Sequence, residues 1–329
     1  MSMSPKIWVL VDNRIGNANQ AIELAEKIGQ SYEIKKIGYN LLGFLPSIIL
    51  GLFPLHVKSL ILSDLLQSEM PDVVISSGRR TAAVALYLKR CSKRPIKLIQ
   101  IMRPAIGEEN FDLIVLPQHD NFNNTVPNVV RIVGALTDVK NKIKNNMAAF
   151  ESRYPEAKNF IAVVVGGNTK GYQLSLNDAK LLATTLVNIL EQNSINLFIT
   201  FSRRTPQPVK DYFIQIFPSP NIIYDPSTND VNPYPAMLGK AAYIISTGDS
   251  ITMCSEAVGT GKPVFIFSPP AFKLKKHNFF IQQLIDLGLA KRLDISQFRI
   301  EKYEYEPLYE IERIAGVIKE KIINPVAKE

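Results

Sequence analysis

The chain is poor in the residues that build metal and disulfide sites. Its 329 residues include two cysteines, three histidines and one tryptophan. Cys91 and Cys254 lie in unrelated segments and fit neither a disulfide framework nor a zinc site. No His-Glu-x-x-His motif is present, and residues 225–230 match an Asp-x-Asp metal motif poorly. We therefore expect a reducing compartment and a site that works without a metal.

The signatures of nicotinamide and ATP binding are also missing. The polar loop at residues 12–20 has no Gly-x-Gly-x-x-Gly fingerprint, which argues against a dinucleotide site. Residues 259–262 do not complete a Walker P-loop, which argues against an ATPase. Because no helix carries a suitable Tyr-x-x-x-Lys pair either, a nucleotide-sugar epimerase is also disfavoured. We expect no cofactor.

A long apolar run is absent as well. Residues 41–55 are the most apolar stretch, but two glycines and two prolines interrupt it, and it is shorter than the roughly 20 residues that span a bilayer. Two interpretations stay open: a buried helix, or an interfacial element with His56 and Lys58 at its edge. The chain begins almost directly with the apolar run 7–11, too short for a signal peptide. This predicts a cytoplasmic protein, peripheral on the membrane's cytoplasmic face if the second interpretation holds.

Basic residues outnumber acidic ones. The net charge of +8 predicts anionic partners, and nucleotides, anionic lipids and nucleic acids all qualify. Nucleic acid is disfavoured, because basic and aromatic residues do not interleave in the patterns of nucleic-acid-binding modules. The densest basic cluster, residues 273–277, is either a solvated loop or a membrane-facing one.

What is present is the alternation of strands and helices that is typical of parallel α/β sheets. The length suits two domains. Strands are expected at 7–11, 32–37, 73–75, 97–101, 113–116 and 129–133, and again at 160–165, 196–200, 221–224, 241–245 and 264–267. A polar helix at 137–153 leads to Pro155, the expected linker. We predict two doubly wound domains, 1–153 and 154–306, and a terminal segment, 307–329, with an apolar helical face.

Residues 246–264 are the most informative segment. Small polar residues follow a strand there, Ser250 or Thr252 can cap a helix, and Glu256 lies in that helix. Ligands of open α/β sheets bind at the carboxyl ends of strands, where free amides at a helix start favour a diphosphate. The carboxylate of Glu256 could accept two ribose hydroxyls. An ordinary helix cap and turn is the simpler interpretation of the same residues.

Further polar loops follow other predicted strands, and paired arginines there suit phosphate. In the second domain we assign to a nucleotide-binding site Gly166, Gly167, Asn168, Ser202, Arg203, Arg204, Thr247, Asp249, Ser250, Met253, Ser255 and Glu256. In the first domain we assign to the acceptor or phosphate side Arg14, Gly16, Asn17, Gln20, Ser77, Gly78, Arg79 and Arg103. Two candidates compete for the general base that takes the proton of an acceptor hydroxyl. One is His119 with Asp120, because the ordinary pKa of histidine lies near neutrality, and the other is Asp12.

The complete string 246–264 resembles the donor-binding segment of GT-B glycosyltransferases. Together with the Asp-x-Arg-x-Gly-Asn-x-x-Gln string at 12–20, it looks most like the family of the plant mitochondrial-fission factor and its bacterial relatives. The resemblance implies a GT-B fold, a terminal helix that crosses back to the first domain, and a nucleotide-sugar donor whose uracil or ribose side Asn232 would line. It also implies an acceptor that is lipid-linked or part of an envelope glycan, and an anionic membrane surface as a partner.

Two functions therefore stay open. One is a metal-independent glycosyltransferase that acts on a nucleoside-diphosphate sugar. The other is a membrane-associated adaptor of the fission type that keeps the fold without activity. GT-B enzymes that act on lipid-linked acceptors carry a histidine in the first loop, and no histidine follows Gly16 in this one. The catalytic base is therefore left open.

Overall fold

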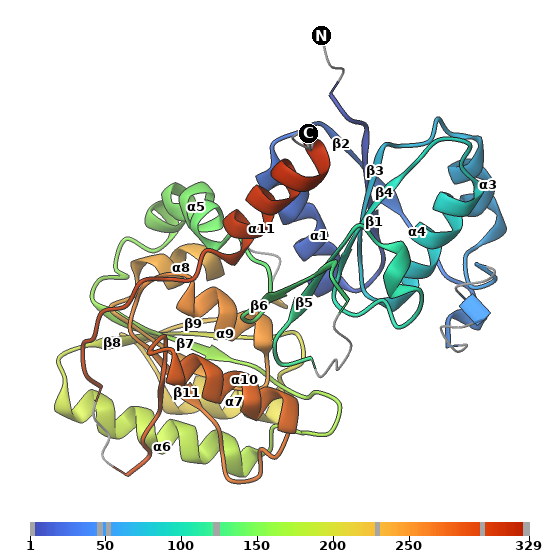
Figure 1. Cartoon of the computed structure of the whole chain (residues 1–329). Helices are drawn as coiled ribbons and strands as arrows, with labels where there is room; N and C mark the ends of the chain where they lie inside the picture. Colours follow the sequence, from blue (N-terminus) through green and yellow to red (C-terminus); the bar gives the residue numbers. More distant parts are fainter. Residues whose placement is uncertain are drawn as a thin grey trace. The chain divides into compact units, whose positions relative to one another are not determined.

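The computed structural model describes residues 4–44, 49–50, 54–120, 126–227, 231–296 and 300–324. The chain divides into two compact units. Unit 1 is Met1–Thr137 with Tyr309–Glu329, and unit 2 is Asp138–Leu308. Each unit is built on one six-stranded parallel sheet with helices on its faces (Figure 1). The sequence predicts both parallel α/β sheets, but only five of the six strands of the second one.

Unit 1 has the strand order β2-β1-β3-β4-β5-β6. Its strands are β1 (Ile7–Val11), β2 (Tyr32–Lys36), β3 (Val73–Ser77), β4 (Lys97–Ile101), β5 (Leu113–Pro117) and β6 (Val129–Ile132). Its helices are α1 (Ile15–Ile28), α3 (Ser59–Gln67), α4 (Arg79–Cys91) and α11 (Glu310–Ile318), with short 3-10 turns η1 (Leu41–Phe44) and η2 (Glu108–Asn110) and a π-turn η3 (Lys319–Ile323).

The central strands of unit 1 are buried on both faces, as a parallel sheet requires. Successive residues of β1 alternate between the two faces: Val9 packs in the cluster that contains α1, whereas Trp8 and Leu10 pack in the cluster that contains α4. The sheet therefore separates two apolar layers. This explains why β1 is an uninterrupted apolar run in the sequence.

The terminal helix α11 returns to unit 1 and packs on α1 (Figure 1). Its residues Ile311, Ile314 and Ile318 are buried in the same cluster as α1. Lys27 Nζ of α1 lies 2.8 Å from Glu312 Oε1 of α11. The apolar face of α11 thus packs on a helix from the start of the chain, and the Lys27–Glu312 pair spans 285 positions.

Unit 2 has the strand order β12-β11-β10-β7-β8-β9. Its strands are β7 (Phe160–Val165), β8 (Asn196–Phe201), β9 (Ile222–Tyr224), β10 (Tyr243–Thr247), β11 (Val264–Phe267) and β12 (Lys291–Arg292). Its helices are α5 (Val139–Arg153), α6 (Leu176–Gln192), α7 (Gln207–Ile216), α8 (Tyr234–Lys240), α9 (Ile251–Val258) and α10 (Lys275–Asp286).

Three local features differ from the sequence expectation. Helix α5 belongs to unit 2, because it packs on α8, so the unit boundary falls at 137/138 and not at 153/154. Strand β10 begins two residues later than expected. Lys275 to His277, expected in a loop, form the first turn of α10, because Phe280, Ile281 and Leu284 give that helix a buried face.

The apolar stretch 41–55 lies only partly within the described residues. It contributes the turn η1, while residues 45–48 and 51–53 lie outside the description. Leu41 and Leu55 are exposed, at 88% and 50%, whereas Leu50 is buried. No helix among the described residues is long and apolar enough to cross a membrane.

Candidate functional site

The strand order places a topological switch point in each sheet, where ligands of open α/β folds bind. In unit 2 the chain runs from β7 outward through β8 and β9, then returns to the other side of β7 as β10. The loops after β7 and β10 therefore diverge at the carboxyl edge. In unit 1 the loops after β1 and β3 do the same. The four polar loops that the sequence singles out at 12–20, 77–80, 166–168 and 247–250 lie at these two points.

Asp249 ties the unit 2 loops together. Its side chain is 1% exposed. Its Oδ2 accepts hydrogen bonds from Gly167 N at 2.9 Å and Arg204 Nη2 at 3.3 Å, and its Oδ1 accepts one from Thr247 Oγ1 at 2.6 Å. Thr247 Oγ1 in turn accepts from Gly166 N at 2.8 Å. The carboxylate thus holds the loops after β7 and β10 in one arrangement.

The loop after β8 is held by the same web. Arg204 Nη1 donates to Asn168 O at 2.8 Å, and Arg204 O accepts from Asn168 N at 3.1 Å. Ser202 Oγ accepts from Arg204 N at 3.1 Å, so Ser202 shapes the turn. The guanidinium of Arg204 remains 41% exposed, and Arg203 is exposed. Unit 2 therefore presents arginine to solvent at the switch point.

The backbone amides of Gly166, Gly167 and Asn168 are therefore already bonded within the protein. Their glycines serve close packing: a Cβ on Gly167 would lie 2.2 Å from Arg204 backbone atoms. In α9 the side chain of Ser250 accepts from Met253 N, as a cap does. The amides of Ile251 and Thr252 are then the donors that this capping side chain does not engage. Amides of this kind at a helix start suit an anion.

His277, in the first turn of α10, belongs to this site although the sequence pattern did not indicate it. The pKa of His277 is lowered, chiefly by burial and also by the charges of Lys276 and Arg204. The charge of Asp249 and a hydrogen bond with the Asp249 backbone oppose this shift. The ring also packs edge-on against Phe272, with centroids 5.9 Å apart. A titratable side chain therefore lies beside the Asp249 loop. The only sequence signal was its place in a basic cluster.

Glu256 lies in α9 and is 8% exposed. Lys142 Nζ, from α5, lies 2.9 Å from its Oε1. Tyr234 is also adjacent: burial, then the charge of Glu256, raises the pKa of Tyr234 far above its ordinary value. Ser255 Oγ donates to Ile251 O at 2.8 Å, and Asn232 Oδ1 accepts from Tyr234 N at 3.1 Å. The predicted ribose ligand is thus a carboxylate that Lys142 already holds.

In unit 1 the predicted loop residues have local partners. Asp12 Oδ1 accepts from Arg14 N at 2.9 Å, and Gln20 Nε2 donates to Gly16 O at 3.2 Å. Gln20 is buried, and its Oε1 accepts from Leu136 N at 3.1 Å, so its amide ties α1 to the segment after β6. Asn17 lies over the loop after β3. A Cβ on Gly78 would come within 2.5 Å of Asn17 Nδ2.

The competing bases lie on separate loops. His119 and Asp120 follow β5, whereas Asp12 follows β1, and β3 and β4 lie between these strands. At about 4.8 Å per strand, the two strands are roughly 14 Å apart. His119 is 8% exposed, and Asp120 O accepts from Arg131 Nη1 at 2.9 Å. Arg103, after β4, pairs with Glu108 at 3.7 Å. The fold does not bring the candidate bases together.

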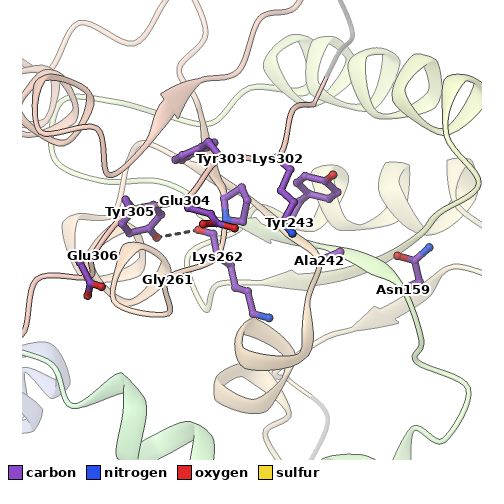
Figure 2. A pocket seen from close by; sticks show the side chains of 11 residues that line it. Asn159, Ala242, Tyr243, Gly261, Lys262, Lys302, Tyr303, Glu304, Tyr305 and Glu306 are labelled. Carbon is purple, nitrogen blue, oxygen red and sulfur yellow. Dashed lines mark hydrogen bonds between the residues drawn. The ribbon is translucent and has the colours of Figure 1, made fainter.

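A cavity of about 860 Å³ lies at the opposite edge of the unit 2 sheet (Figure 2). Ala242 and Pro263 in its wall precede β10 and β11, so it opens at the amino ends of the strands. Tyr303 Oη donates to Val264 O at 2.8 Å and Tyr305 Oη to Lys262 O at 2.8 Å, which fastens the extended segment before α11 to this edge. We place the candidate site at the other edge, because the switch point and its cationic side chains lie there.

Among the described residues, no group of three or more histidines, cysteines and carboxylates could hold a metal. The donor set of the switch points consists of amides, hydroxyls, arginines and a histidine. Such a set suits an anion.

Solved structures of other proteins share this fold. The UDP-GlcNAc 2-epimerase of Methanocaldococcus jannaschii aligns with a TM-score of 0.61 at 13% identity, over 95% of this chain and 99% of that one. Os79 of O. sativa, in complex with UDP, gives 0.54 at 10% identity over 96% and 91%. S. aureus MnaA, in a structure with UDP, gives 0.52 at 17% identity over 96% of each chain. The predicted GT-B-like architecture is thereby confirmed.

One sequence argument is corrected by these neighbours. The missing fingerprint and Tyr-x-x-x-Lys pair argue against an epimerase of the nicotinamide-dependent kind alone. Because a protein named as an epimerase has this chain's fold, the fold itself does not separate epimerases from glycosyltransferases. At such low identity the likeness establishes architecture and nothing finer.

Sequence comparison is more specific. An uncharacterized protein of Rickettsia prowazekii is 38% identical in an alignment of 345 positions that covers 95% of this chain and 97% of that protein. Mitochondrial fission protein ELM1 of Arabidopsis thaliana is 24% identical in an alignment of 279 positions that covers 78% of this chain and 65% of the plant protein. A family model described as mitochondrial fission ELM1 matches residues 15–322. The chain belongs to the mitochondrial fission ELM1 family.

Proposed function

We propose that this protein is a metal-independent glycosyltransferase that uses a nucleoside-diphosphate sugar. The observation that carries the proposal is the unit 2 switch point, where Asp249 locks three loops beside the start of α9, Arg204 and His277. This arrangement fits a diphosphate that leaves with negative charge. Two proteins with the same fold are described in complex with UDP, which supports the same ligand class here.

In the proposed reaction the acceptor oxygen bonds to the anomeric carbon while the bond from that carbon to the diphosphate breaks. The electron pair of the broken bond stays on the diphosphate. The amides that begin α9, with Arg204 and His277, stabilise its charge. In this proposal Glu256 holds the ribose, and Asn232 and Met253 contact the nucleoside. The acceptor proton passes to Asp12 or to His119 with Asp120.

We propose a lipid-linked acceptor at a membrane surface. Five apolar side chains in or beside the stretch 41–55 are exposed, a surface that water disfavours. They are Leu41 at 88%, Leu60 at 81%, Leu55 at 50%, Ile49 at 42% and Leu42 at 39%. The net charge of +8 would attract the chain to anionic lipids. These side chains would enter the leaflet that carries the acceptor.

One observation favours the second function, an adaptor without activity. The amides of Gly166, Gly167 and Asn168 bond within the protein, and Lys142 occupies Glu256. A site whose groups satisfy one another needs no ligand to stay formed. The name of the Arabidopsis relative, a mitochondrial fission protein, agrees with such a role.

Calorimetric titration with UDP, GDP, CDP and ADP, with and without magnesium, separates the two. We expect one nucleoside diphosphate to bind without magnesium, and Glu256→Ala to weaken it. Glu191→Ala, an exposed glutamate on α6, is the matched control and should bind as the parent does. Failure of all four nucleotides to bind would overturn the transferase and leave the adaptor.

A further inference from the structure

Helix α4 of unit 1 begins in an unusual way. It is 13 residues long, its N-cap is Gly78, and no side chain caps its first amides. Its first turn carries Arg79 and Arg80 and no acidic residue. A helix start with free amides and adjacent arginines has a positive potential that favours an anion.

A buried hydroxyl without a partner lies at the same point. Ser77, the last residue of β3, is 3% exposed, and its Oγ has no hydrogen-bond partner among the described residues. Its neighbour Ser76, by contrast, donates to Gln100 Oε1 at 2.6 Å. Because buried polar atoms in folded proteins nearly always have partners, the Ser77 hydroxyl indicates a missing one.

Arg80 is held by rings, and no carboxylate of the described residues pairs with it. Its guanidinium carbon lies 4.9 Å from the centroid of Tyr39. Tyr39 stacks on the ring of His56 at 5.1 Å, and His56 Nε2 lies 3.2 Å from Arg80 O. The Nε atom of Arg80 is buried and has no hydrogen-bond partner among the described residues. The stack thus fixes a cation whose Nε donor lacks a partner among the described residues.

We propose that Ser77, Arg79, Arg80 and the first amides of α4 bind a phosphate group. The amide of Asn17, directly above Gly78, supplies a further donor. The assignment of this phosphate to the acceptor substrate rests on the proposed function. The phosphate site itself does not depend on that function. The segment between Tyr39 and His56 exposes Leu41, Leu42 and Leu55, so the phosphate belongs either to a lipid headgroup or to a free compound.

The histidines make the test specific for this site. The chain has three, of which His56 contacts Arg80 and His277 lies at the unit 2 switch point. In the full chain labelled with ¹⁵N-histidine, inorganic phosphate should shift the His56 ring signals in a saturable way. UDP should shift those of His277. Failure of the proposed function would appear at His277, and failure of this inference at His56.

Variants and a lipid arm complete the experiment. Arg80→Gln should weaken phosphate binding about tenfold and Ser77→Ala less, while Arg80→Lys keeps part of it. Arg90→Gln, at the other end of α4, should leave binding unchanged. Phosphatidic acid vesicles that outcompete inorganic phosphate, when phosphatidylcholine vesicles do not, would identify a lipid phosphate; no competition would identify a free one. A His56 signal that neither phosphate nor vesicles shift, or an equal response in Arg80→Gln, would overturn the site.

Discussion

A Cβ atom on Gly166 would lie 2.1 Å from Oδ1 of Asp249 and 2.3 Å from its Oδ2. The carboxylate therefore fills the volume where a side chain would be. Since the same carboxylate binds Gly167, Thr247 and Arg204, the missing side chain at 166 is a condition for the whole switch point of unit 2.

Gly166→Ala should displace Asp249 and loosen the loops around it. Overpacking of a buried site costs about 1–3 kcal/mol, so a clear fall in the thermal midpoint is expected. Gly16→Ala is the matched control, because a Cβ there meets nothing within 4 Å. Differential scanning calorimetry of both variants measures the effect. Equal midpoints for the two would contradict the close approach at Gly166.

Lys142→Met should destabilise unit 2 by leaving Glu256 without its cation. A buried group that loses its partner costs about 1–3 kcal/mol, and the lysine is 27% exposed, so the lower end applies. Urea unfolding measures the change. Lys142→Arg should recover most of the stability, and Lys140→Met, on the exposed side of α5, should have little effect. An equal loss of unfolding free energy in Lys140→Met would mean that the Lys142–Glu256 pair contributes nothing to stability.

The affinity for a nucleoside diphosphate should rise as pH falls. Burial and Lys276 lower the pKa of His277, so the ring is largely neutral at pH 7 in the free protein. A diphosphate beside the ring favours the protonated form, and binding should therefore take up a proton below about pH 6.5. Titration across this range measures the slope. His277→Gln should flatten it; a slope that persists in the variant would assign the proton to another group.

Much of the fold could be predicted because its signals are local. The apolar runs that became β1 and β7 are buried on both faces, and a parallel sheet leaves its polar loops at the carboxyl edge. The partners within the site could not, because they depend on packing between distant segments. Lys142 and Glu256 lie 114 positions apart, and α10 places His277 beside Asp249 only through its buried apolar face. No sequence pattern marks such pairs.

Acid should destabilise unit 1 through His56. The side chain is fully buried, and this burial is the main cause that lowers its pKa. The charges of Arg80 and Arg79 lower the pKa further, whereas the hydrogen bond to Arg80 O raises it. The unfolded chain, with a histidine pKa of about 6.5, then binds more protons than the folded chain. The stability that neutral His56 contributes is fully present above about pH 6.5 and is lost as pH falls toward the lower folded pKa.

Urea midpoints at a series of pH values should show this loss of stability in the parent protein. In His56→Gln the curve should be flatter at acid pH, whereas His277→Gln, at a half-buried site, should change it less. A parent curve that is flat below pH 6.5 would mean that His56 is as easily protonated in the folded chain as in the unfolded one.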